Sequence, residues 1–216
     1  MKHERLTHAQ RKQQTRERLF DAARTVFLEK GVAATSVEDI AEAAGYTRGA
    51  FYSNFRGKRD VLVELLQRDA VPARENLQAS IEMGGTPKEM LARVIAYYGS
   101  GEFDSDCFPL WIEAQLLARQ DNLFGERLDV LRHETLFHIS NCLRTFVPDA
   151  DRLWSGGADA LAVALTSLSD GLQFVRMCNT QTVKGQAIPS LLVELASYVS
   201  WQRREDVGRR PSAIER

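Results

Sequence analysis

The fold of this chain is decided by the stretch TSVEDIAEAAGYTRGAFYSNF, residues 35–55, where two short helical patterns meet at a glycine. The first pattern carries an apolar stripe with helical spacing, which consists of Val37, Ile40, Ala41 and Ala44. Gly45 ends this pattern, because glycine readily takes the left-handed conformation of a tight turn. The second pattern covers roughly residues 47–53 and places Phe51 and Phe55 near one face. The stretch therefore predicts a helix-turn-helix unit over residues 35–54, whose second helix would enter the major groove of DNA.

Capping and packing residues accompany the two patterns. Thr35 with Glu38 predicts a capping box at the first helix, and Ser36 with Asp39 is an alternative shifted by one residue. A close crossing of the two helices requires small side chains. We expect them at Ala41, Ala44, Gly49 and Ala50.

The whole chain has the composition of an ordinary globular protein. Of its 216 residues, 44% are hydrophobic and 26% are charged, which is enough apolar material for a core. No run of about 18 apolar residues predicts a membrane span. The N-terminus lacks the apolar centre of a signal peptide, so we expect a cytoplasmic protein with no membrane contact. The three widely spaced cysteines, Cys107, Cys142 and Cys178, predict reduced and mostly buried thiols.

Charge is distributed unevenly along the chain. Residues 1–59 carry twelve Lys and Arg against seven Asp and Glu, whereas residues 60–216 carry sixteen against twenty-two. A basic head on an acidic body suggests that the head meets a polyanion. A solvated, charged helical surface is an equally simple explanation of the charge alone.

Helical periodicity recurs beyond the head, and strand patterns are nearly absent. We therefore predict an all-α fold with a three-helix head and a larger helical body. Pro72 would interrupt or kink the helix that follows Gly57, and this sets the predicted domain boundary. The predicted order is a basic arm at 1–11, a DNA-binding domain at 12–72, a helical body at 73–204 and a flexible tail at 205–216.

Several polar residues around the unit suit contact with DNA. Lys58 follows Gly57 at a helix start, where a cation is unfavourable unless a phosphate lies nearby. Thr35 and Ser36 offer hydroxyls and amides at the other helix start, and Tyr52 can direct its phenol at the DNA backbone. Base reading would fall to Tyr46, Thr47, Arg48 and Asn54. Arginine can bind guanine through two hydrogen bonds, and asparagine can pair with adenine.

Each of these residues also has a plainer interpretation. Tyr52 could be a core aromatic residue, and Arg48 could be a solvated surface residue. The arm could touch flanking phosphates, or it could be an ordinary charged helix start. Its basic residues are Arg5, Arg11, Lys12 and Arg16.

The region 12–72 resembles the DNA-binding domain of the TetR family of ligand-responsive transcriptional repressors. The phrases AARTVFLEKG, TSVEDIAEAAG, YTRGAFYSNF and RGKRDVL carry nearly every anchor of the family pattern at the correct spacing. The resemblance implies phosphate contacts by Thr35, Tyr52 and Lys58, and base reading by the segment 46–49, which includes Gly49. The family often has histidine in place of Asn54, so Asn54 either contacts a base or caps a helix.

Two helices of the body have stripes that suit pairing with a second copy of the chain. One stripe consists of Leu161, Ala164, Leu165, Leu168, Leu172 and Val175, with small residues nearby. The other consists of Phe124, Leu128, Leu131, Ile139 and Phe146. Similarity to the family implies a four-helix homodimer interface, and a two-fold dimer predicts a palindromic operator. Alternatively, both stripes serve only the core of one chain.

The sequence marks a ligand pocket only weakly. Its candidate lining residues are Phe103, Phe108, Trp111, Gln115, His133, Phe137, Phe174 and Met177. Glu113 is either a salt-bridged structural residue or a recogniser of a cationic ligand. We expect no catalytic residue, metal or cofactor, because no nucleophile has a base placed beside it and no ligand cluster has metal spacing.

The predicted function is a sequence-specific transcriptional regulator, a repressor released from a palindromic operator when a small-molecule effector moves the helix at residues 58–71. The alternatives are a helical enzyme and a protein-interaction module with an incidental basic head.

Overall fold

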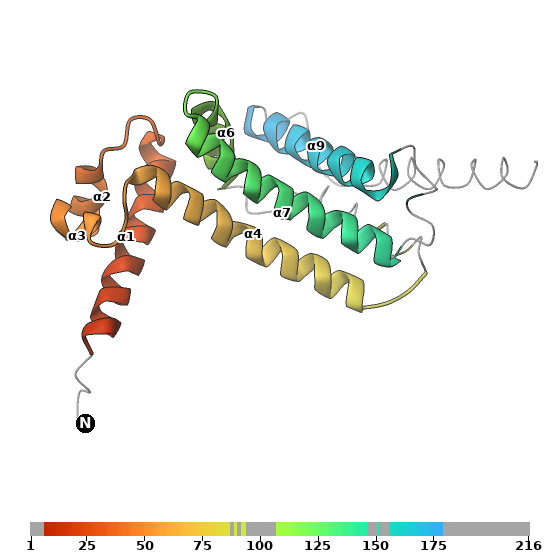
Figure 1. Cartoon of the computed structure of the whole chain (residues 1–216), viewed down its shortest axis with the longest axis horizontal. Coiled ribbons are helices and arrows are strands. Elements are labelled where there is room, and N and C mark those ends of the chain that lie inside the picture. The colour runs from red at the N-terminus through yellow and green to blue at the C-terminus, as the bar shows by residue number, and fades with distance from the viewer. Residues whose placement is uncertain are drawn as a thin grey trace, which may run out of the picture. The chain divides into compact units, whose positions relative to one another are not determined.

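The computed structural model describes residues 7–86, 89, 92–93, 107–146, 151 and 156–178. Every regular element in these ranges is a helix, which confirms the all-α prediction (Figure 1). The helices are α1 (His8–Lys30), α2 (Val37–Ala43), α3 (Arg48–Tyr52), α4 (Lys58–Glu82), α6 (Cys107–Ala118), α7 (Asn122–Phe146) and α9 (Gly157–Cys178). The helix predicted at 188–205, nearly all of that at 87–100, and the residues Arg5 and Phe103 lie outside the described ranges. None of the described helices is long and apolar enough to cross a membrane.

The chain divides into two compact units, and the division differs from a single cut in the sequence. The first unit combines residues 1–71 with residues 106–132, and the second combines residues 72–105 with residues 133–216. Helix α4 continues through Pro72 to Glu82, so the predicted interruption at Pro72 is wrong. Pro72 is exposed, and the helix tolerates the ring on its solvent side.

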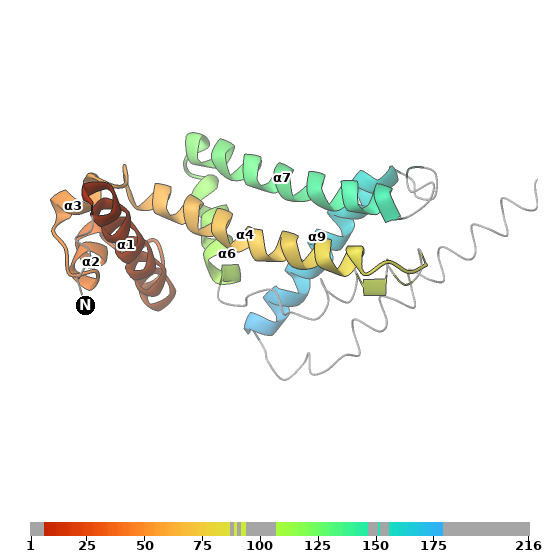
Figure 2. The ribbon, with the colours of Figure 1, turned by 90° about the horizontal axis from the view of Figure 1, so that it is seen from below.

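The first unit has one core, to which distant parts of the chain contribute. Phe27 of α1, Ile40 of α2 and Phe51 of α3 are fully or almost fully buried. They belong to the same cluster as Leu110 of α6 and Leu128 of α7. Figures 1 and 2 show α2 and α3 lying beside α1, whose N-terminal turns extend beyond them. Residues 8–14 of α1 are exposed accordingly.

The turn between α2 and α3 has the geometry that the glycine predicted. Gly45 has a φ of 71°. Its amide donates to the carbonyl of Glu42 over 2.9 Å, and the amide of Tyr46 donates to the carbonyl of Ala41 over 2.8 Å. This pair of hydrogen bonds is the Schellman motif, which ends a helix and satisfies its last carbonyl groups. The turn therefore sets the direction in which α3 leaves α2.

In the second unit, the end of α7 contacts the start of α9. Arg144 of α7 forms an ion pair with Asp159 of α9 over 2.7 Å, and Ile139, Leu143 and Ala162 are buried. The cysteines are all free; Cys107 and Cys142 are buried as predicted, whereas Cys178 is exposed.

Candidate nucleic-acid interface

Helix α3 presents one anchored side and one exposed side. Phe51 is fully buried and fixes the helix to the core. The opposite side is exposed; we call it the reading face, and it consists of Thr47, Arg48, Gly49 and Tyr52. The Thr47 hydroxyl accepts a hydrogen bond from the amide of Ala50 over 3.2 Å, so it caps the helix while its methyl group remains available.

Tyr52 and Arg48 lie together on this face. The Tyr52 side chain is 49% exposed, so it is not the core aromatic residue of the plainer interpretation. Its ring meets Phe51 edge-on at 5.6 Å between centroids, and the Arg48 guanidinium lies 5.5 Å from the Tyr52 ring centroid. The Tyr52 phenol and the Glu38 carboxylate raise the pKa of Arg48, which stays charged.

Gly49 is not the small packing residue that the sequence suggested. A Cβ atom at this position would meet only the Thr47 hydroxyl, at an ordinary contact distance of 3.7 Å. The fold of the free chain therefore gives no reason for glycine, which costs roughly 1 kcal/mol relative to alanine inside a helix. Glycine at this point lets the backbone of α3 approach a bound molecule closely.

The start of α2 uses its hydroxyls internally. Ser36 and Asp39 form the capping box, with the amide of Asp39 donating to the Ser36 hydroxyl over 3.0 Å. Lys30 lies 2.8 Å from Asp39, and its hydrogen bond, together with those from Ser36, lowers the pKa of the Asp39 carboxyl. The capping box expected from Thr35 and Glu38 is therefore wrong, and the shifted alternative is correct.

Thr35 is buried, with 2% of its surface exposed. Its hydroxyl donates to the carbonyl of Gly31 over 2.7 Å. In the free chain the Thr35 hydroxyl is therefore used inside the protein, and its contact with a phosphate stays a prediction. Its position fixes the loop before α2 to the end of α1.

Lys58 also points toward the protein. Its ammonium group donates to three backbone carbonyls, those of Val32 at 2.8 Å, Ala33 at 3.1 Å and Thr35 at 2.6 Å. An ammonium group has three donors, and all three are used here. Partial burial lowers the pKa of Lys58. In the free chain Lys58 therefore holds the loop between α1 and α2 against the start of α4, and its phosphate contact stays a prediction.

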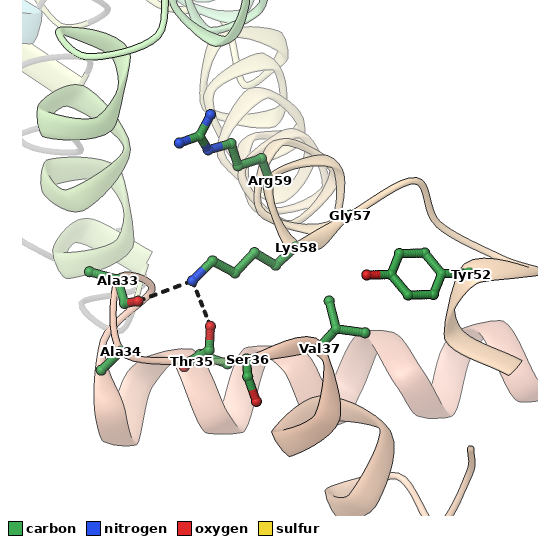
Figure 3. Close-up of a pocket in the computed structure, with 9 residues that line it drawn as sticks. All are labelled: Ala33, Ala34, Thr35, Ser36, Val37, Tyr52, Gly57, Lys58 and Arg59. Carbon is green, nitrogen blue, oxygen red and sulfur yellow. Dashed lines mark hydrogen bonds between the residues drawn. The ribbon is translucent and has the colours of Figure 1, made fainter. Parts of the chain in front are cut away.

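An open cleft of about 550 Å³ lies between this loop, α3 and the start of α4 (Figure 3). Its lining residues are Ala33, Ala34, Thr35, Ser36, Val37, Tyr52, Gly57, Lys58 and Arg59. The Tyr52 phenol points toward the cleft, whereas Lys58 extends to the carbonyls of the loop. The first amides of α4 carry the positive end of a 25-residue helix, so the cleft suits an anion.

The remaining base-reading candidates are partly used by the fold. Tyr46 is half-buried and packs against the core. The Asn54 amide nitrogen donates to the carbonyl of Ala50 over 2.8 Å. Of the two roles considered for Asn54, the structure shows capping at the end of α3.

The basic arm is divided in the same way. Arg11 and Lys12 lie on the exposed first turns of α1. Arg16 instead pairs with Glu64 over 2.6 Å and stacks 4.3 Å from the ring centroid of Phe55. Arg16 therefore holds α1 against the core, which corrects its assignment to the phosphate-binding arm.

Two acidic residues have roles that sequence reasoning missed. Glu38 of α2 forms an ion pair with Arg48 of α3 over 3.1 Å. Glu113 of α6 accepts a hydrogen bond from the backbone amide of Val32 over 2.6 Å. Of its two expected roles, this contact matches the structural one, because the carboxylate fixes the loop between α1 and α2. No local signal marks the Glu113 contact, because its partners are 81 residues apart. For Glu38, the sequence did indicate that its helix and the helix of Arg48 are neighbours in the predicted helix-turn-helix unit.

The predicted effector residues are distributed over both units. Phe108, Trp111 and Gln115 lie on α6 of the first unit, where Phe108 is buried and Trp111 packs against the core. His133 and Phe137 lie on α7, and Phe174 and Met177 on α9, in the second unit. All four of these side chains are exposed, with Phe137 at 66%, so among the described residues they do not form the predicted enclosed lining.

The two predicted dimer stripes differ in burial. The stripe on α7 is wrong as a free surface, because Phe124, Leu128, Leu131 and Ile139 are each at most 4% exposed within one chain. The α9 helix is different and keeps one side exposed. That side consists of Ala160, Val163, Ala164, Ser167, Leu168, Gly171, Phe174 and Val175. Leu165, in contrast, is buried.

Comparison with known proteins gives the same assignment for the head. Residues 19–65 match the sequence profile of bacterial regulatory proteins of the tetR family. The HTH-type transcriptional regulator AcrR of Shigella flexneri is 34% identical over 89 residues, which are 41% of each chain. The matched region thus spans less than half the length of this relative.

Solved structures extend the likeness of the fold to most of the chain. A protein assigned as a transcriptional regulator of Pseudomonas aeruginosa PAO1 is 21% identical and has a TM-score of 0.70, covering 95% of this chain and 96% of that one. FadR of Bacillus subtilis, solved in complex with stearoyl-CoA, is 24% identical and has a TM-score of 0.67. This alignment covers 83% of the present chain and 96% of FadR.

The geometry of the head defines a helix-turn-helix unit, in which a short exposed helix follows a Schellman turn. The matching profile assigns residues 19–65 to the tetR family of bacterial regulatory proteins, and the solved structures share the fold of most of the chain.

Proposed function

We propose that this protein is a homodimeric transcriptional regulator that binds a palindromic DNA operator through α3 and leaves it when a small molecule binds. The observation that carries the proposal is the reading face, where Arg48, Gly49 and Tyr52 are exposed around a helix anchored by Phe51. An exposed surface of this kind after a helix-turn-helix turn fits the major groove.

The residues of the head divide the work of binding. Arg48 has free N–H donors that can bind O6 and N7 of guanine, and the Thr47 methyl group can contact a thymine methyl group. The cleft beside Tyr52 and the start of α4 suits a backbone phosphate. Phosphate contacts place the head on the duplex, whereas Arg48 supplies sequence preference. This reading requires access to chromosomal DNA, so the proposal implies a cytoplasmic protein that is not an enzyme.

A homodimer is proposed from the exposed side of α9. Ala160, Ala164, Ser167 and Gly171 recur three or four residues apart and form a ridge of small residues. Large apolar residues flank this ridge, including Val163 and Phe174 at 49% and 48% exposure. Small residues allow helices to approach closely, and the apolar flank supplies buried area when two copies pair. A two-fold pair would present two heads, which predicts a palindromic site.

Release by an effector follows from population shift. A molecule that binds the body better in the form unable to bind DNA lowers operator affinity, typically by about 5- to 150-fold. FadR holds stearoyl-CoA and shares this fold, so long-chain acyl-CoA is the first compound to test.

The test is selection from a random duplex library with the full-length protein, followed by sequencing and titration of the selected duplex. We expect a palindrome, a stoichiometry of two chains per site, and release by a compound from an effector panel. The absence of any enriched sequence would overturn the proposal. Enrichment of a single half-site by a monomer would overturn its dimeric form.

A further inference from the structure

An acidic residue lies beside the reading face of an otherwise basic head. The Glu38 carboxylate of α2 lies 3.1 Å from the Arg48 guanidinium of α3, with 56% and 65% of the two side chains exposed. The same guanidinium lies 5.5 Å from the ring centroid of Tyr52. Arg48 is thus held from two sides, by a residue of the neighbouring helix and by one of its own helix.

This arrangement has an electrostatic cost in a DNA-binding surface. A carboxylate close to a duplex is repelled by phosphates, so Glu38 reduces the sequence-independent part of the affinity. The helix start does not require Glu38, because Ser36 and Asp39 already form the capping box of α2. An exposed ion pair also adds little to stability. Glu38 also lies in the first turn of α2, where a carboxylate interacts favourably with the helix dipole, so its contact with Arg48 is a second role beside that one.

The chemistry of arginine suggests what this second role is. A guanidinium has five N–H donors in a rigid plane, and a guanine base uses two of them. Glu38 can keep hold of one edge while the other edge faces a base. Because a long side chain loses rotamer freedom when it binds, a side chain already held in place loses less.

We propose that Glu38 is a positioning residue that determines specificity: from α2 it holds Arg48 of α3 beside Tyr52, so that the free edge of the guanidinium reads one base pair. This inference rests on the proposed function. Glu38 acts through Arg48, and its contribution should disappear when Arg48 is removed.

The experiment measures base preference with full-length protein and a random duplex library for wild type, Glu38→Ala, Glu38→Gln, Arg48→Ala and the double variant. Glu42→Gln is the matched control, since it removes the same charge from an exposed site on α2 whose nearby cation is Lys30. Thermal unfolding of each variant confirms that the head is folded.

Arg48→Ala identifies the base pair that Arg48 reads. We expect Glu38→Ala to lower discrimination at that base pair by about two- to fivefold, the range of an exposed charged pair. Glu38→Gln, which keeps a hydrogen-bond acceptor, should lie between wild type and Glu38→Ala. Both Glu38→Gln and Glu42→Gln should raise affinity for random duplex, but only the Glu38 variants should change base preference.

Each other outcome is decisive. An unchanged preference in Glu38→Ala overturns the inference. An equal change in wild-type and Arg48→Ala backgrounds also overturns it, because Glu38 would then contact a base directly, for example the amino group of cytosine. If wild type shows no base preference at all, the proposed function itself fails, and this result is distinguishable from the other two.

Discussion

Two regions of the head contain residue types that suit DNA, yet the structure uses them differently. On the reading face, Arg48, Gly49 and Tyr52 are exposed and contribute little to the packing of the core. In the loop between α1 and α2, Thr35 is buried, and Lys58 at the start of α4 donates to three backbone carbonyls of this loop. A match to a family motif therefore identifies residues that are important for binding DNA. It does not separate residues that contact DNA from residues that hold the binding helix in place.

The strongest test of this division is Lys58→Ala. Loss of three charged hydrogen bonds at a partly buried position should lower stability by about 1–3 kcal/mol. It should also weaken binding to all sequences, because the loop and the start of α2 lose their support. Thermal unfolding and titration at several salt concentrations measure the two effects.

The salt dependence of Lys58→Ala separates the two possible roles. A structural role leaves the slope of log K against log salt nearly unchanged, whereas a lost phosphate contact reduces it by about 0.9. Arg56→Ala, an exposed cation two residues earlier, is the control and should not change stability by more than about 0.5 kcal/mol. A normal unfolding temperature with a reduced slope would return Lys58 to the DNA-binding group.

Gly49→Ala tests the other region of this comparison, the reading face of α3. The added methyl group has open space, so the head should keep its stability or gain up to about 1 kcal/mol. Affinity for DNA should nevertheless fall, because the methyl group lies between the backbone of α3 and the duplex. Unfolding temperature and operator affinity are measured on the same preparation. Unchanged affinity would mean that the duplex does not approach α3 at this point.

The smallest effect on stability is expected from Asp39→Asn, which alters the capping box of α2 next to the loop between α1 and α2. The Lys30 and Ser36 contacts lower the pKa of Asp39 in the folded state, so its charged form stabilises the fold above the pKa of the unfolded chain. That contribution is lost as the pH falls toward the folded-state pKa. The variant should therefore unfold at a lower temperature than wild type at pH 7, and the difference should narrow below about pH 4.

If the two proteins kept the same difference in unfolding temperature between pH 7 and pH 3, the Asp39 charge would not be the stabilising feature. The neutral hydrogen bonds of the capping box would then explain the effect alone.

Local signals predicted the elements of the head well. Gly45 marks the turn because its positive φ is required there, and Ser36 with Asp39 marks the start of α2 because a capping box joins residues three apart. Periodicity also predicted α6, α7 and α9, since each buries a side with helical spacing. Contacts between residues near one another in sequence can be read from the sequence.

The errors came from contacts between distant residues. The structural contacts of Lys58 were missed because its partners, backbone carbonyls 23 to 26 residues earlier, carry no sequence signal. The α7 stripe looked like a dimer surface because an apolar stripe does not state whether its partner belongs to the same chain. Glu113 could not be assigned for the same reason, since it contacts a backbone amide in the loop.

The shared core of the first unit has a practical consequence for dissecting the protein. Leu110, Phe124 and Leu128 belong to the same cluster as Phe51, and Glu113 completes the hydrogen bonding of Val32. A fragment that stops at Val71 would leave part of this cluster in water and one buried amide unpaired. Chimeras that exchange the head between regulators should therefore transfer residues 106–132 together with residues 1–71, because these two segments form one core.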